Sequence, residues 1–396
     1  MFNKEMIKLG SCRSEIRELF EYGKTLALKV GEQNVFDFTL GNPAVKTPDE
    51  ITKEIVNIAT NDISAHAYTS AQGSILARKA IKDDVFKRFN FKLDENLIYL
   101  TCGAAASLTI SLKALISSAN DKVVALAPYF PEYKVFAENA GATFVYAKAQ
   151  EPEFSINFES LEEIIDGSVK AVIINSPNNP SGAVYSEEEI IRLAELLNKK
   201  QKEYNSAIYL ISDEPYREIV FGDYDCPYIP KYYDNTIVCY SYSKSLSLPG
   251  ERIGYIALSP NCQESEDLYY AVCGAGRSQG FVCAPSLFQK VIEKCSGIFS
   301  EITLYKENSQ ILVENLTKLG FSCNNPKGAF YLMLKAPNGD AKEFSNTAKE
   351  LGLLLVPSNS FGVEGYVRIA TCVPKDRVIR SIPAFTKLAK IYNLAL

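Results

Sequence analysis

The sequence predicts an α/β protein with a mostly parallel seven-stranded sheet sandwiched by helices, joined to a smaller α+β domain. Between residues 97 and 258, short apolar runs rich in β-branched residues alternate with amphipathic helical patterns. Continuous apolar runs of this kind are typical of strands that are buried on both faces of a parallel sheet. Past residue 285, the pattern changes to long helices followed by two short strands, which indicates a second unit.

Seven segments carry the strand pattern of the large sheet. In chain order they are 97–100, 123–127, 143–147, 170–174, 207–211, 236–240 and 253–258. Helices are expected between them, as at 185–201, and also within about 286–318, where the second unit begins. That unit has strand candidates at 329–334 and 366–370.

The chain is expected to have two closely docked domains and an N-terminal arm. We place the arm at residues 1–44, packing with the small domain, the large domain at 45–290, and the small domain at 291–396. A chain of 396 residues is long enough for two such cores.

Composition excludes several classes of function. The net charge of −5 leaves no basic face for nucleic acid or acidic lipid. No apolar run reaches the roughly 18 residues of a membrane span, and the N-terminus lacks the apolar core of a signal peptide. Ten cysteines without a C-x-x-C pair indicate reduced thiols in a cytoplasmic protein. The single histidine, His66, cannot build a multi-histidine metal site, so it is interpreted as structural and no metal is expected.

Chemical motifs follow several predicted strands, at the end where parallel sheets bind ligands. After strand 97–100, Gly103 leads into an alanine-rich helix whose first amides, at Ala104 and Ala105, can hold a phosphate. After strand 123–127, either Tyr129 or Phe130 can stack on a flat cofactor ring. A plain helix start and ordinary core packing are the structural alternatives.

Two further strand ends carry polar groups suited to a pyridine ring. Asn179, in the turn NSPNNPSG, can donate a hydrogen bond to a phenolate oxygen. Asp213 can keep a pyridine nitrogen protonated, an interaction of about 4 kcal/mol before desolvation, at about 4 Å and an effective dielectric constant near 20. Tyr216 lies three positions later and can bond the oxygen beside that ring. Loop composition and a helix N-cap are the structural interpretations of these residues.

The stretch SYSKSLSLPGER, from residue 241, is the most informative motif. Lysine forms Schiff bases with carbonyl compounds, of which pyridoxal 5'-phosphate is the common protein cofactor, so Lys244 is the candidate attachment point. The hydroxyls of Ser241 and Ser243 and the guanidinium of Arg252 suit a dianionic phosphate. A solvated surface loop is the alternative for this motif alone.

Taken in order, these motifs resemble those of the fold-type I, class I/II pyridoxal-phosphate-dependent aminotransferases, of the aspartate aminotransferase-like kind. The resemblance covers essentially the whole chain. GNP at 41–43, Tyr68, and GYVRIA at 365–370 extend the resemblance. It implies the pyridoxal-phosphate-dependent transferase fold, the cofactor pyridoxal 5'-phosphate, and a homodimer with shared active sites. Tyr68 would reach the phosphate in the neighbouring subunit.

The resemblance also implies a role for each site residue. Lys244 would carry the internal aldimine and move the proton between substrate and cofactor, and Asp213 would pair with the pyridine nitrogen. Tyr216 and Asn179 would contact the 3'-oxygen of the cofactor, and Phe130 would contact the face of its ring. The phosphate, at the Gly103 turn, would be held by Arg252, Ser241, Ser243, Ala104 and Ala105. Arg368 would bind the substrate α-carboxylate, together with the backbone of Gly41 and with Asn179.

The function implied is transfer of an amino group between an L-amino acid and a 2-oxo acid by a ping-pong mechanism. A C–S β-lyase of the same fold would share these residues and is the first alternative. The second is the cofactor-binding sensor domain of a transcription regulator, against which the acidic charge speaks. Arg277, expected in a polar loop, either binds a distal substrate carboxylate or is solvated surface.

Overall fold

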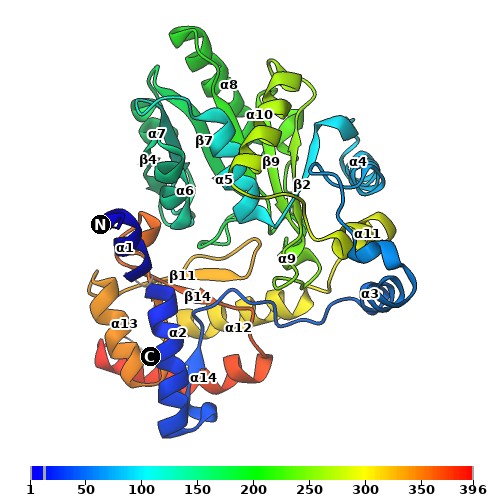
Figure 1. Ribbon diagram of the computed structural model, residues 1–396. Coiled ribbons are helices and arrows are strands. Elements are labelled where there is room, and N and C mark those ends of the chain that lie inside the picture. Colours follow the sequence, from blue (N-terminus) through cyan, green and yellow to red (C-terminus); the bar gives the residue numbers. More distant parts are fainter. Residues whose placement is uncertain (1, 12–14, 395–396) are drawn as a thin grey trace.

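A central seven-stranded sheet organises the computed structural model, which describes residues 2–11 and 15–394 (Figure 1). Its strand order is β2-β10-β9-β8-β7-β3-β4. Neighbouring strands are parallel except for β10, which is antiparallel to both β2 and β9. The strands are β2 (Ile98–Thr101), β3 (Lys122–Leu126), β4 (Thr143–Ala147), β7 (Val169–Asn175), β8 (Tyr209–Asp213), β9 (Thr236–Ser241) and β10 (Gly254–Leu258). Each overlaps one predicted segment, so the mostly parallel seven-stranded sheet is confirmed.

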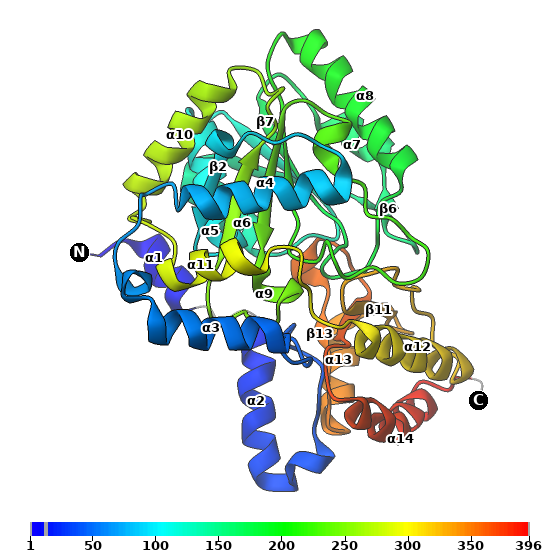
Figure 2. The same cartoon turned by 90° about the vertical axis from the view of Figure 1, so that its right-hand side faces the viewer.

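Helices cover both faces of this sheet, because its central strands are apolar on both sides. One face packs against α5 (Ala104–Leu115), α6 (Glu132–Ala140) and α10 (Ser265–Ser278). The other face packs against α4 (Ile75–Phe89) and α11 (Ser286–Cys295) at one end and α7 (Phe158–Ile164) and α8 (Glu187–Tyr204) at the other. Figure 2 shows α11 lying between α4 and α3 (Asp49–Asn61), and it contacts both. The large lobe is therefore a three-layer sandwich.

A smaller lobe follows in the chain and lies below the large sheet in Figure 1. Its three-stranded antiparallel sheet has the order β11-β14-β13 and is covered by helices that share one apolar core. The elements are α12 (Thr303–Lys318), β11 (Tyr331–Lys335), α13 (Ala341–Glu350), β13 (Val356–Pro357), β14 (Tyr366–Ala370) and α14 (Lys375–Ile391). The helical stretch expected at 286–318 is two helices, α11 and α12, of which only α12 belongs to this core.

The N-terminal segment packs on the smaller lobe. After α1 (Lys4–Ser11) and α2 (Glu15–Val30), strand β1 (Phe36–Asp37) pairs in parallel with β12 (Leu353–Leu354). Phe38 is buried in the same core as α14. The remaining short elements are β5 (Ala149–Gln150), which pairs with β6 (Ser155–Ile156), α9 (Tyr242–Ser245), and the 3-10 turns Glu32–Asn34, Ile63–His66, Glu95–Leu97, Ile229–Lys231 and Asn359–Phe361. The domain boundaries at residues 44 and 290 stay a prediction.

The reversed strand β10 brings distant segments to one edge of the sheet. The carboxyl ends of β2, β7, β8 and β9 meet at this edge, and because β10 runs the opposite way its amino end lies there too. Gly254 opens β10 and pairs with both Thr101 and Ser241. A Cβ at Gly254 would collide with the Tyr240 carbonyl and lie 3.0 Å from the Cα of Gly103, so only glycine permits this approach. In the part of the chain that the structure describes, no helix is both long and apolar enough to span a membrane.

Candidate active site

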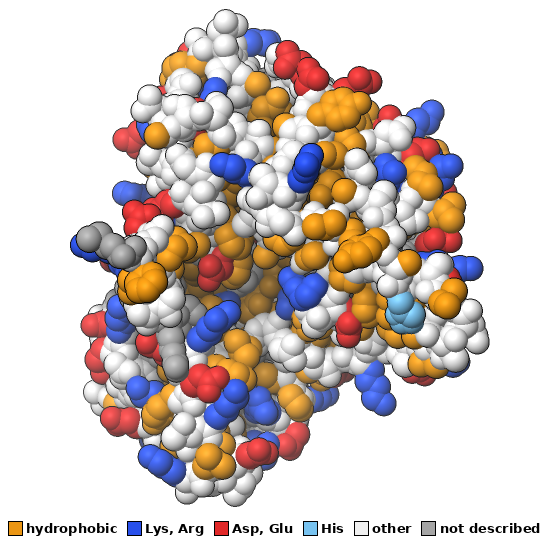
Figure 3. Space-filling view, viewed as in Figure 1, with side chains coloured by type: hydrophobic (Ala, Val, Ile, Leu, Met, Phe, Trp, Pro, Cys, Tyr) orange, Lys and Arg blue, Asp and Glu red, His pale blue; other side chains and the backbone are white. Residues whose placement is uncertain are grey.

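A cavity of about 320 Å³ lies between the two lobes, where Figure 3 shows the molecule hollowed. Side chains from the carboxyl edge of the large sheet form one wall, and the small sheet and the N-terminal segment form the other. The lining residues are Ile16, Leu40, Gly41, Ala104, Ala105, Leu108, Phe130, Asn175, Asn179, Asp213, Pro215, Tyr216, Ser241, Ser243, Lys244, Pro249, Arg252, Tyr331 and Arg368.

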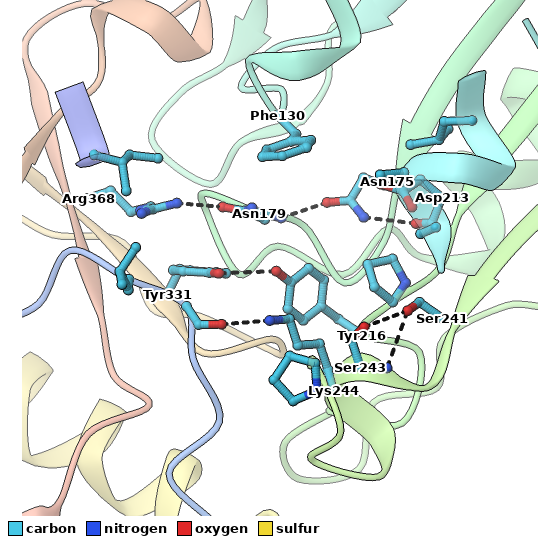
Figure 4. A pocket seen from close by; sticks show the side chains of 18 of the residues that line it. Phe130, Asn175, Asn179, Asp213, Tyr216, Ser241, Ser243, Lys244, Tyr331 and Arg368 are labelled. Atoms are coloured by element: carbon cyan, nitrogen blue, oxygen red, sulfur yellow. Dashed lines mark hydrogen bonds between the residues drawn. The ribbon is translucent and has the colours of Figure 1, made fainter. Parts of the chain in front are cut away.

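Lys244 projects into this cavity from α9, the short helix that follows β9 (Figure 4). Its Nζ donates a hydrogen bond of 2.6 Å to the carbonyl oxygen of Gly41. Burial, with smaller contributions from the guanidinium groups of Arg252 and Arg368, lowers the pKa of Lys244 to about 8. A lysine amine with this pKa is neutral often enough near neutral pH to act as a nucleophile or a base.

Asp213 ends β8 and is 5% exposed. Its Oδ2 accepts a 2.5 Å hydrogen bond from the hydroxyl of Tyr133, whereas its Oδ1 is buried without a hydrogen-bond partner among the described residues. Burial raises the pKa of Asp213 to about 7, which the hydrogen bond from Tyr133 partly offsets. An unpartnered buried carboxylate oxygen is costly unless a ligand satisfies it, so this atom marks a position for a cationic N–H donor.

Asn175, the last residue of β7, connects two sides of the site. Its Nδ2 donates to the backbone oxygen of Asp213 at 2.8 Å, and its Oδ1 accepts from the backbone N–H of Asn179 at 2.7 Å. Asn179 in turn accepts a 3.0 Å hydrogen bond from Arg368 through its Oδ1. A continuous polar network therefore runs from the large sheet to the small one (Figure 4).

Groups that can bind an anion lie near the amino end of β10, on one side of the cavity. Arg252 donates a hydrogen bond from Nη1 to the hydroxyl of Ser243 at 3.2 Å. The hydroxyls of Ser241 and Ser243 form a hydrogen bond of 2.8 Å with each other. Arg252 has a φ of 51°, a left-handed conformation that costs a non-glycine residue about 1 kcal/mol or more. Gly103, the N-cap of α5, packs so closely that a Cβ there would lie 2.7 Å from Nη2 of Arg252. The guanidinium and the first amides of α5 thus converge on one point.

Arg368 reaches the cavity from β14 in the small sheet and is 2% exposed. Its Nη2 donates to the backbone oxygen of Thr39 at 2.5 Å, and its Nε is buried with no hydrogen-bond partner among the described residues. A guanidinium that keeps unused donors in a buried site is suited to binding a carboxylate.

The sequence left Tyr129 and Phe130 as alternatives for the ring that lines the site. Phe130 lines the cavity. Tyr129 is buried and packs against Phe144 and Tyr146, where it belongs to the large core. The strand end therefore presents Phe130, and not Tyr129, to a ligand.

Most of the predicted site residues line this one cavity. Gly103 is adjacent to it, since a Cβ at Gly103 would lie against the guanidinium of Arg252, a lining residue. Tyr68 is elsewhere, 92% exposed on the surface. The expectation of a loop around Arg277 is wrong, because Arg277 lies exposed in the last turn of α10, whose apolar residues pack on α5 and continue the helix through the glycines.

Three polar residues that line or support the cavity were not identified from the sequence: Tyr133, Asn175 and Tyr331. Tyr133 lies three positions after Phe130 and Asn175 opens the turn NSPNNPSG, so both lie beside residues that the sequence indicates. Tyr331 has no such signal, since its role depends on packing between the lobes.

The chain matches the model of the family described as aminotransferase class I and II over residues 33–382. It is 29% identical over 374 residues to an aspartate aminotransferase of Thermotoga maritima, covering 93% of this chain and 94% of that protein. It is also 29% identical over 361 residues to an LL-diaminopimelate aminotransferase of Aquifex aeolicus, covering 88% and 90%. Among solved structures, an amino transferase from Eubacterium rectale has a TM-score of 0.97 and 50% sequence identity, covering 99% of each chain.

The raised pKa of Asp213 predicts a pH-dependent stability of the ligand-free protein. Since the folded pKa is about 7 and the ordinary value is 3.8, the folded state binds more protons than the unfolded state between these pH values. Stability from this group therefore falls as pH rises, by at most about 3 kcal/mol between pH 5 and pH 8. Asp213→Asn should remove that fall, measured as the free energy of unfolding in urea at the two pH values.

Asp62→Asn is the matched control. A hydrogen bond from Lys290 holds the pKa of Asp62 at about 2, so its contribution is lost only as pH falls below about 4. This control should keep the wild-type difference between pH 5 and pH 8. If Asp213→Asn keeps it as well, the carboxyl group of Asp213 is not protonated as described.

Proposed function

Because this chain belongs to the class I and II aminotransferases and is an enzyme of the transaminase type, we propose that it exchanges an amino group between an L-amino acid and a 2-oxo acid in a ping-pong reaction with pyridoxal 5'-phosphate as cofactor. One observation carries the proposal. The amine of Lys244, the free carboxylate oxygen of Asp213 and the guanidinium of Arg368 face a single cavity.

The residues present fit this cofactor. The unpartnered Oδ1 of Asp213 suits a protonated pyridine nitrogen, and Arg252 with Ser241 and Ser243 suits a phosphate. Phe130 supplies a ring face within the same cavity. We assign the 3'-oxygen contact to Asn179 and Tyr216, as the family resemblance implies.

When bound, pyridoxal phosphate supplies a carbonyl carbon for the amine and a ring that withdraws electrons. Lys244 would hold the cofactor through its amine and would carry a proton to or from the substrate Cα, a task suited to its pKa of about 8. Asp213 keeps a proton on the ring nitrogen by its negative charge. Arg368 binds the α-carboxylate, which orients the Cα hydrogen toward Lys244.

We also propose that two copies of the chain form the working enzyme. Tyr68 and Ile63 are both 92% exposed, an unusual state for large apolar side chains, and Val282 is 66% exposed. The segment from Ile63 to Tyr68 and the segment that follows Val282 lie side by side, since the hydroxyl of Ser286 donates a hydrogen bond to the carbonyl of Ala65 at 2.6 Å. A second copy covering this surface would place Tyr68 at its partner's phosphate position, as the family resemblance implies.

Lys244→Ala tests the proposed chemistry. The variant should fold and bind pyridoxal phosphate through the phosphate contacts, but borohydride should no longer fix the cofactor to the chain. Turnover should fall by roughly 10³-fold or more, because one amine serves both as attachment point and as proton carrier. The measurements are mass spectrometry after borohydride reduction and the rate of 2-oxo acid formation.

Lys199→Ala is the control for that substitution, since Lys199 is exposed and pairs with Glu162 at the surface, away from the cavity. It should retain both properties. Multiple turnovers by Lys244→Ala without added amine would contradict the assignment. Release of ammonia and a thiol from a cysteine conjugate, without amino transfer to any 2-oxo acid, would instead support the C–S lyase activity.

Ile63→Asp and Tyr68→Phe test the assembly. A charge at position 63 should oppose burial against a second copy and yield monomers without activity. Tyr68→Phe should remain dimeric but bind the cofactor roughly tenfold more weakly, through loss of one hydrogen bond to phosphate. Light scattering and cofactor titration measure these effects.

The control for assembly is Leu28→Asp, on the 90% exposed Leu28 of α2, which lies outside that surface. It should stay dimeric and active. A fully active monomer of Ile63→Asp at assay concentration would rule out shared active sites.

A further inference from the structure

Tyr331 contacts residues on both sides of the cavity (Figure 4). It begins β11 in the small sheet, is 3% exposed and lines the cavity. Its hydroxyl lies 3.1 Å from the hydroxyl of Tyr216 on the large lobe. Its ring lies 4.7 Å from the guanidinium carbon of Arg368. One side chain therefore touches both a proposed cofactor contact and the proposed carboxylate contact.

The guanidinium of Arg368 lies between aromatic rings and hydrogen-bond acceptors. The guanidinium also lies 5.3 Å from the ring of Phe361, and two of its N–H groups are used by Asn179 and Thr39. The two rings contact the guanidinium, and these hydrogen bonds use its Nη atoms. The N–H of Nε has no partner among the described residues and is left for a ligand. A buried cation–π contact contributes about 0.5–2 kcal/mol, which is enough to affect how well a carboxylate is held.

The hydroxyl of Tyr331 has a separate effect on Tyr216. Burial raises the pKa of Tyr331 to about 12 and raises that of Tyr216 well above its ordinary value, so both phenols stay protonated near neutral pH. Two protonated hydroxyls that share one hydrogen bond have a single proton left over for another acceptor. If Tyr331 donates to Tyr216, the remaining proton is that of Tyr216 and is available to a ligand.

The approach of Gly41 supports a fixed position for this hydroxyl. A Cβ at Gly41 would collide with the Tyr331 hydroxyl, so the glycine lets this phenol pack directly on the N-terminal segment. The same Gly41 carbonyl accepts the hydrogen bond from Lys244. The Tyr331 hydroxyl therefore packs against the residue that also holds Lys244.

We propose that Tyr331 is a positioning residue with two separable roles, both of which rest on the proposed function. Its hydroxyl donates to Tyr216 and so directs the proton of Tyr216 toward the 3'-oxygen of the cofactor. Its ring holds Arg368 in the orientation that binds the substrate α-carboxylate. Removing the hydroxyl should alter the cofactor side alone, and removing the ring should alter the carboxylate side as well.

Tyr331→Phe tests the first role, because it removes the hydroxyl and keeps the ring. The pH midpoint of the visible absorbance change of the holoenzyme should rise by roughly 0.5–1 unit, since a less well-directed Tyr216 stabilises the deprotonated cofactor oxygen less. The dissociation constant of propionate, a non-reactive carboxylate, should stay within about twofold of the wild-type value. Both are measured by absorbance titration of the holoenzyme.

Tyr331→Leu tests the second role, because it also removes the ring. Propionate should bind about 3- to 30-fold more weakly, and the KM values of the amino acid and the 2-oxo acid should rise together. Tyr331→Met, whose unbranched side chain is longer and more adaptable, gives the same test if the leucine variant does not fold. Tyr305→Phe is the control: Tyr305 is buried in the same aromatic cluster but does not line the cavity, and its variant should change neither property.

Three results would overturn this inference. They are an unchanged absorbance midpoint in Tyr331→Phe, wild-type propionate affinity in folded Tyr331→Leu or Tyr331→Met, and equal loss of both properties in Tyr331→Phe. Failure of the proposed function has a different signature, namely a wild-type holoenzyme that binds propionate but transfers no amino group. Propionate binding by the variants still tests the contact of Tyr331 with Arg368 in that case.

Discussion

The site depends on keeping ionisable groups buried with incomplete partners. Asp213 and Arg368 are 5% and 2% exposed, yet each keeps one polar atom with no hydrogen-bond partner among the described residues. Burial raises the pKa of Asp213 to about 7 and lowers that of Lys244 to about 8, so both groups resist their charged forms in the ligand-free protein. A ligand that supplies a cationic N–H and a carboxylate relieves these costs, and its binding must stabilise the fold.

The topology of the large sheet makes that burial possible. Parallel strands deliver Asn175, Asp213 and the turn before Lys244 to one edge, while the reversed β10 returns Arg252 to the same edge. Side chains that come from strand ends are held by the sheet and need little ordering when a ligand binds. The left-handed backbone of Arg252 is a local strain that this tight packing around Gly254 and Gly103 sustains.

Sequence reasoning succeeded where the chemistry and its position are local in the chain. The apolar runs predict all seven strands of the large sheet, and residues just past those strands, such as Asp213 and Lys244, line the cavity. It failed where a residue is defined by what lies across the cavity. Nothing near Tyr331 in the chain signals Arg368, and no local pattern tells that the glycines before Arg277 continue a helix, because packing of α10 on α5 decides it.

The two lobes are linked through the same groups that are proposed to contact the ligand. The side chain of Arg368 in the small sheet donates a hydrogen bond to Asn179 of the large lobe. The hydroxyl of Tyr331, also in the small sheet, shares a hydrogen bond with that of Tyr216. A carboxylate that takes donors from Arg368 must compete with or add to the Asn179 contact, and so it acts on the link between the lobes. A substrate carboxylate bound at Arg368, as proposed, would therefore act on the side-chain contacts that join the two lobes.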